Sequence, residues 1–135
     1  MSRKRVERAA ASLGASQSLG TVHLVIFVPS VDRNGRKLEG SSWTRPTLEV
    51  LGRLFRGATA NPRGLGVWRN DRAGGELVFD DTTIVFSFVT PADLTDSSLM
   101  VLRHFLHRMG REANQGEVGL VLDGTYIGIT EFEEA

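Results

Sequence analysis

The dipeptide Asp123-Gly124 constrains the fold of this chain more than any other feature of the sequence. It lies between two apolar runs in the segment GREANQGEVGLVLDGTYIGIT, which spans 110–130. A two-residue Asp-Gly loop requires positive φ at both positions, so it predicts a tight hairpin in one register. In that register Leu120 faces Ile127, and the two strands share one apolar face.

The other face of the predicted hairpin brings Gly119 opposite Gly128. Two facing glycines leave no side chain at that point, which suits the close approach of a ligand or another chain. We therefore predict a ligand site there, with Glu117 as a general base or as the partner of a cationic group. Helix capping and loop hydrogen bonds are an alternative explanation for the amide side chains of the adjoining loop. The predicted ligand-binding residues are Arg111, Asn114, Gln115, Gly119, Tyr126, Gly128 and Trp68.

The remaining apolar pattern predicts the order β-α-β-β-α-β, with the last strand doubled by its hairpin return. Two helices that each follow a strand and pack on one face of an antiparallel sheet give an α+β fold, a ferredoxin-like sandwich. One domain is expected over 21–132, preceded by a flexible basic tail over 1–20. The strands are expected at Thr21–Pro29, Leu65–Arg69, Glu76–Asp80 and Thr83–Thr90, and the helices at Arg45–Arg56 and Thr95–Glu112.

Both faces of the first predicted strand are apolar, which is typical of a central strand. Leu24 and Ile26 lie on one face, and His23, Val25 and Phe27 lie on the other. The sequence does not decide which set points away from the helices. If the His23 set does, the open face of the sheet is too apolar to stay in water. We then expect a homo-oligomer or a partner protein on that face.

Composition excludes some classes of function. The chain of 135 residues balances 16 basic residues with 16 acidic ones and contains no cysteine. Disulfide frameworks and thiolate metal sites are therefore excluded, and a neutral chain disfavours nucleic acid as a partner. No segment approaches the ~20 apolar residues of a membrane span, so we expect no membrane association and a cytoplasmic location.

Three histidines could in principle bind zinc, but their predicted positions oppose it. His104 and His107 are expected on the solvent side of the second helix, so a site that included His23 would have to cross the core. We predict neither a metal nor a cofactor.

Two segments, GATANPRGLGVWRN and GREANQGEVGLVLDGTYIGIT, resemble an uncharacterised bacterial family of small ferredoxin-like domains over 21–132. That resemblance implies the fold and no activity. The layout of elements is also similar to that of phage-type S-adenosylmethionine lyases. This similarity implies a trimer with sites between subunits, where the carboxylate of the substrate attacks its own side chain and acidic residues hold the substrate. Glu117 and the hairpin would occupy the corresponding region.

Three hypotheses follow, and the sequence does not decide whether the chain is an enzyme. The first is an oligomeric module that binds a small ligand or a partner protein on its open sheet face. The alternative is a small metal-independent lyase or isomerase at a subunit boundary, acting on a nucleoside-like substrate such as S-adenosylmethionine. Nucleic-acid binding is the weakest hypothesis, because the basic, glycine and aromatic run of ferredoxin-like RNA binders is missing.

Overall fold

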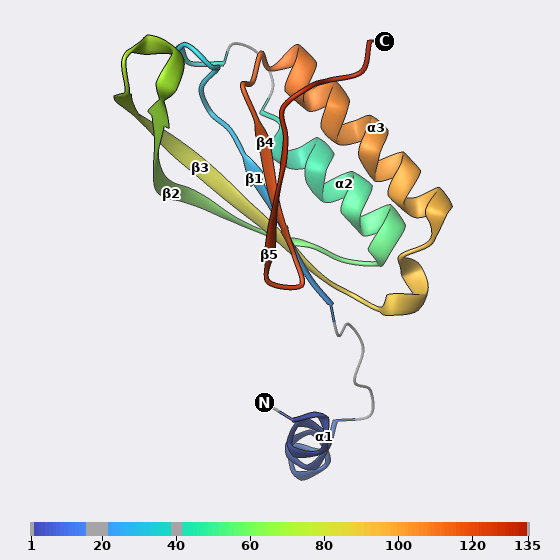
Figure 1. Cartoon of the computed structure of the whole chain (residues 1–135). Helices are drawn as coiled ribbons and strands as arrows, with labels where there is room; N and C mark the ends of the chain where they lie inside the picture. The colour runs from blue at the N-terminus through green and yellow to red at the C-terminus, as the bar shows by residue number, and fades with distance from the viewer. Residues whose placement is uncertain (1, 16–21, 39–41, 135) are drawn as a thin grey trace.

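The strands of the computed structural model, which describes residues 2–15, 22–38 and 42–134, form a five-stranded antiparallel sheet. The order across the sheet is β2-β3-β1-β4-β5, so β1 lies in the middle (Figure 1). The strands are β1 (Val22–Val28), β2 (Thr59–Asn70), β3 (Glu76–Val89), β4 (Val118–Leu122) and β5 (Thr125–Ile129). The helices are α1 (Arg3–Ser12), α2 (Thr44–Phe55) and α3 (Asp96–Glu112), with short 3-10 turns at Asp71–Ala73 and Pro91–Asp93.

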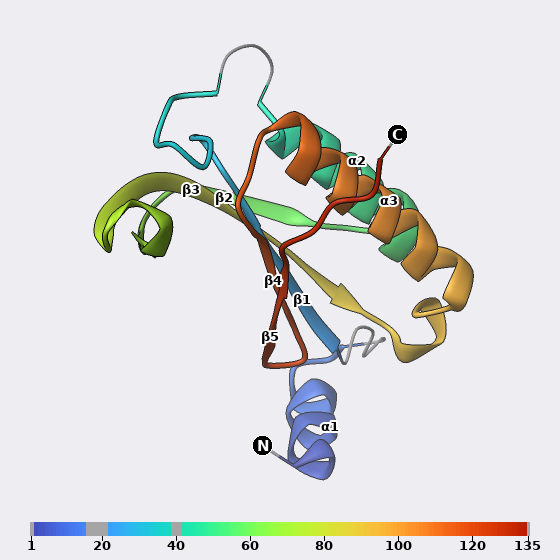
Figure 2. The same cartoon turned by 45° about the horizontal axis from the view of Figure 1, so that its top comes forward.

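Helices α2 and α3 lie side by side on one face of the sheet and leave the other face open (Figures 1 and 2). Leu24, Ile26 and Val28 of β1 point into the core beneath the helices and are almost fully buried. The alternate residues of β1, including Val25 and Phe27, therefore belong to the open face. This settles the choice that the sequence left open, and the predicted α+β class with helices on one face is confirmed.

The terminal hairpin has the register that its turn predicts. Asp123 and Gly124 adopt φ values of +50° and +82°, as a two-residue turn of this kind requires. Leu120 pairs with Ile127, and the two glycines face each other one position away. Leu120 is buried, but Ile127 is 40% exposed because β5 is the edge strand of the sheet.

The first hairpin differs from the prediction. β2 starts at Thr59, well before the predicted start at Leu65, and β3 is one strand of 14 residues where two were expected. A register shift between Asn61 and Gly64 absorbs Pro62, which has no N–H to donate, and Arg63, which has φ +63°. Pairing with a long, strongly apolar partner strand therefore overrides the local preference of glycine and proline.

Part of the predicted N-terminal tail is helical. Residues Arg3–Ser12 form α1, whose first turn is capped by the Ser2 side chain, and none of its residues is buried. Residues 1 and 16–20 of the predicted tail lie outside the described residues. None of the described helices has the length and apolar character needed to cross a bilayer.

The segment after β5 packs along α3. The Phe132 ring lies so close to Gly110 that a Cβ on this glycine would be 2.2 Å from it. The Glu133 N–H donates to His107 Nδ1 at 2.9 Å, so His107 is buried beneath this segment. The prediction that His107 lies on the solvent side of its helix is therefore wrong, because the chain returns over that surface.

Candidate functional site

A cleft of about 580 Å³ lies on the open face, where the ends of β1 and the terminal hairpin meet the β2–β3 ribbon. Its wall combines apolar, acidic and basic side chains from five separate segments of the chain. Those used below are Phe27, Arg33, Trp68, Asp80, Glu117 and Tyr126.

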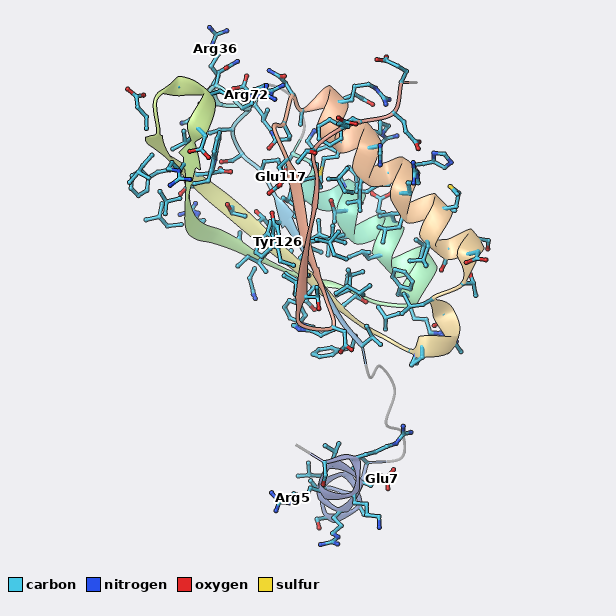
Figure 3. The ribbon with its side chains drawn as sticks, viewed as in Figure 1. Arg5, Glu7, Arg36, Arg72, Glu117 and Tyr126 are labelled. Atoms are coloured by element: carbon cyan, nitrogen blue, oxygen red, sulfur yellow. The ribbon has the colours of Figure 1, made fainter. Side chains whose placement is uncertain are left out.

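Glu117 and Tyr126 form a hydrogen-bonded pair in this cleft. The Tyr126 hydroxyl donates to Glu117 Oε2 at 2.6 Å, and Figure 3 shows both side chains on the terminal hairpin. Partial burial of the phenol raises its pKa, and the hydrogen bond and negative charge of Glu117 raise it further, to about 12. Tyr126 is therefore protonated at neutral pH and acts as a donor that fixes one oxygen of the carboxylate.

The two facing glycines make room for this pair. A Cβ on Gly119 would lie 2.5 Å from the Tyr126 hydroxyl oxygen, and a Cβ on Gly128 would lie 2.5 Å from Glu117 Oε1. The expectation of an uncovered glycine surface was therefore too simple, because the two polar side chains lie over it. The missing Cβ atoms allow a carboxylate and a phenol to lie flat against the strands.

Asp80 supports the same cleft from β3. Its carboxylate Oδ1 accepts hydrogen bonds from the Ser30 N–H at 3.2 Å and from the Ser30 hydroxyl at 2.6 Å. Asp80 is buried, and these bonds tie the loop after β1 to β3.

Gln115 and Asn114 tie the loop after β1 to the end of α3. Gln115 Nε2 donates to the Val31 carbonyl at 2.8 Å, and the Arg33 N–H donates to the Asn114 carbonyl at 2.8 Å. Asn114 has φ +48°, a left-handed conformation that asparagine tolerates well. Both residues hold the cleft wall in place in this structure, and through them Arg33 reaches the cleft.

The structure brings together five of the eight predicted site residues. Glu117, Trp68, Tyr126, Gly119 and Gln115 line the cleft, whereas Gly128 lies beneath the Glu117 carboxylate. Asn114 lies behind the wall, and Arg111 lies on α3, where its guanidinium donates to the Glu133 carbonyl.

Sequence reasoning missed Arg33, Phe27 and Asp80 as cleft residues. Phe27 could have been found, because it alternates with the buried residues of β1. No signal in the sequence pointed to Arg33. Its loop is brought to the cleft by tertiary hydrogen bonds that no local pattern encodes.

A second hollow, of about 450 Å³, lies at the opposite end of the sheet. Its charged groups, Arg56 and Asp93, pair with each other at 3.2 Å, so they satisfy one another. Among residues 2–15, 22–38 and 42–134, no three His, Asp or Glu side chains gather closely enough to hold a metal ion. The cleft with Glu117 and Tyr126 is therefore the better candidate site.

No family model matches the chain, and no curated protein matches it in sequence. Solved structures with the same fold do exist. A phage S-adenosylmethionine lyase in complex with S-methyl-5′-thioadenosine has a TM-score of 0.63 and 15% identity, over 86% of this chain and 95% of that chain. A phage S-adenosylmethionine lyase in the apo state has a TM-score of 0.56 and 14% identity, over 86% of this chain and 94% of that chain. At this level of identity the likeness shows the fold, and it agrees with the similarity of layout seen in the sequence.

Proposed function

We propose that the cleft binds S-adenosylmethionine and that the protein is an S-adenosylmethionine lyase. The observation that carries the proposal is the Glu117 carboxylate, held by Tyr126 in a cleft of the fold that the phage lyases share. A carboxylate that is fixed by a neutral donor keeps its negative charge and its position. Both properties suit recognition of a sulfonium cation.

The reaction needs little chemistry from the protein. An oxygen of the substrate's own carboxylate attacks its γ-carbon, the bond from that carbon to sulfur breaks, and the electron pair stays on sulfur. The products are a lactone and the neutral thioether S-methyl-5′-thioadenosine. Because a positive and a negative charge disappear together, a cleft that excludes water and aligns the two groups favours the transition state.

Two cleft side chains have roles in this proposal that follow from their chemistry. Glu117 attracts and orients the cationic part of the substrate. Trp68 offers an indole that is 38% exposed and on which an adenine ring can stack. Neither role requires a metal or a cofactor.

The strand order supports the finer interpretation of the fold. Within the sheet, β4, β1, β3 and β2 are neighbours in that order, with two helices on one face, which is the arrangement expected for a ferredoxin-like sandwich. In this interpretation β5 is an added edge strand that brings Tyr126 to the open face.

The test is conversion of S-adenosylmethionine to S-methyl-5′-thioadenosine, followed by chromatography of the products. We expect turnover by the natural chain and a loss of roughly 10²-fold or more in kcat/KM for Glu117→Gln, because a positioning charge is removed. Glu49→Gln is the matched control, since Glu49 lies on α2 and pairs with Arg45. Absence of product from the natural chain would contradict the lyase, and equal loss in both variants would contradict the site.

A non-catalytic oligomeric module is the second candidate, and a cluster of rings on the open face favours it. His23 stacks on Phe88 with centroids 4.9 Å apart, and Phe86 packs edge-on to both. Phe88 is 60% exposed, which is unusual for a ring in such a cluster. We propose that copies of the chain associate through this face.

Light scattering after gel filtration measures the assembly, and Phe88→Ser is expected to reduce it. An unchanged mass for this variant, or a natural chain that is monomeric, would contradict this mode of association.

A further inference from the structure

The cleft continues into a pocket of about 380 Å³ whose wall carries three arginines. Arg33 comes from the loop after β1, Arg69 from the end of β2, and Arg72 from the turn between β2 and β3. Figure 3 shows Arg72 and Arg36 at the end of the molecule beyond Glu117 and Tyr126. Arg33, Arg69 and Trp68 border both hollows, so a single ligand can reach from one into the other.

The loop that carries Arg33 is held by its own hydrogen bonds. Asp32 Oδ1 accepts from the N–H groups of Asn34 and Arg36, at 2.8 and 3.1 Å. Burial raises the pKa of Asp32, but these two bonds, the Asn114 side chain and the Arg36 charge outweigh it and lower the pKa. Asp32 is therefore ionised at neutral pH and keeps the turn closed. The Arg33 side chain lies close to Gly116.

The charges of this pocket do not cancel. Arg69 pairs with Asp71 at 2.5 Å. Arg33 and Arg72 form no ion pair with any residue in the described ranges, so each presents guanidinium donors to the pocket. A guanidinium donates two parallel hydrogen bonds to an oxyanion and holds its charge at every physiological pH. Two such groups from distant parts of the chain therefore select an anion with at least two oxygens.

We propose that Arg33 and Arg72 form an oxyanion-binding subsite at the end of the cleft. Its occupant is either the carboxylate of the ligand in the cleft or a free inorganic phosphate. The first source rests on the function proposed above, because S-adenosylmethionine carries a carboxylate at the end away from its adenine. The second source is independent of that function.

Three probes separate these sources by titration calorimetry of the natural chain and its variants. S-adenosylhomocysteine has the nucleoside and the carboxylate but no sulfonium, so the lyase reaction does not consume it. S-methyl-5′-thioadenosine has the same nucleoside without the carboxylate. Inorganic phosphate is the third probe. The variants are the Arg33→Ala/Arg72→Ala double variant and, as the matched control, Arg53→Ala on the exposed side of α2.

If the subsite holds a ligand carboxylate, the double variant binds S-adenosylhomocysteine at least tenfold more weakly, because it loses charged hydrogen bonds, and binds S-methyl-5′-thioadenosine unchanged. If it holds free phosphate, the same variant loses phosphate binding and keeps both nucleosides. Arg53→Ala resembles the natural chain in every titration, and circular dichroism verifies the fold of all variants.

The subsite is overturned if the double variant binds all three probes as the natural chain does, or if the natural chain binds none of them. Failure of the proposed function has a different signature. In that case neither nucleoside binds the natural chain, while phosphate binding that depends on Arg33 and Arg72 persists.

Discussion

The two faces of β1 are built on different principles, although their residues alternate along seven positions. Ile26 is fully buried and pairs across the sheet with Val85 and Leu120, under the two helices. Val25, its neighbour, belongs to the open face and is only half-buried. Packing fixes the first face, so changes there alter stability. Cross-strand contacts between side chains order the second face, so under the proposed function we expect changes there to alter binding more than stability.

The largest expected effect comes from comparing one alanine substitution on each face of β1. Ile26→Ala leaves a cavity beneath the helices and should lower the free energy of unfolding by about 2–5 kcal/mol. Val25→Ala, on the same strand, removes less buried surface and should cost about 1 kcal/mol. Urea denaturation measures both. Equal losses would mean that another copy or partner covers the open face in solution.

One glycine on each helix tests the same contrast between a packed and an unpacked surface. Gly110 on α3 lies under the segment after β5, and Gly52 on α2 has no neighbouring atom within 4 Å. Gly110→Ala drives a methyl group into the Phe132 ring and should destabilise by about 1–3 kcal/mol. Gly52→Ala on α2 meets no atom within 4 Å and should stabilise by up to about 1 kcal/mol, because alanine favours helix. Thermal unfolding measures whether each variant is less or more stable than the natural chain. Stabilisation by Gly110→Ala would show that the segment after β5 does not pack on α3.

The same contrast explains what the sequence could predict of the fold. The terminal hairpin was predictable to the residue because Asp123-Gly124 fixes its register locally. The buried parity of β1 was not, because both of its faces are apolar and only the position of the helices decides between them. The start of β2 was missed because pairing with β3 overrides the local signals of glycine and proline.

The cleft residues that the sequence predicted lie on or beside that hairpin, except for Trp68 on β2. Strand parity brought Glu117 and Tyr126 to one face, although it gave no sign that they bond over the glycines. Arg33 reaches the cleft through hydrogen bonds that involve Gln115 and Asn114, which are distant in sequence. Contacts of this kind depend on the assembled fold, so the arginine end of the cleft became visible only in the structure.

A smaller effect tests the hydrogen bond between Tyr126 and Glu117 on the open face. Tyr126 is the only tyrosine, so its ultraviolet absorbance reports one phenol, and its pKa should be about 12. Because the pKa of this phenol is higher in the folded than in the unfolded chain, the protonated phenol stabilises the fold. This contribution is fully present below pH 10.0 and is lost as the pH rises through about 12. Glu117→Gln should move the midpoint down towards 10.0, whereas Glu49→Gln should not. A midpoint near 10.0 in the natural chain would contradict the hydrogen bond to Glu117.

The smallest effect concerns the segment that covers α3. Glu133 accepts hydrogen bonds from Arg103. The Arg103 bond lowers the pKa of Glu133 below its usual 4.5, although burial opposes this in part.

A carboxyl group with a lowered pKa stabilises the folded state above its unfolded value, and this contribution disappears as the pH falls through the lowered pKa. Glu133→Gln should therefore reduce the melting temperature slightly at neutral pH, and the difference from the natural chain should vanish in acid. Both groups of the pair are partly exposed, so added salt should shrink the difference as well. Glu134→Gln, one residue further along, removes the same charge from an exposed position and is the matched control. If the two variants follow the same pH dependence, the Arg103–Glu133 contact does not hold the segment. The Phe132 ring on Gly110 and the backbone hydrogen bonds of Glu133 with His107 and Arg111 then hold it.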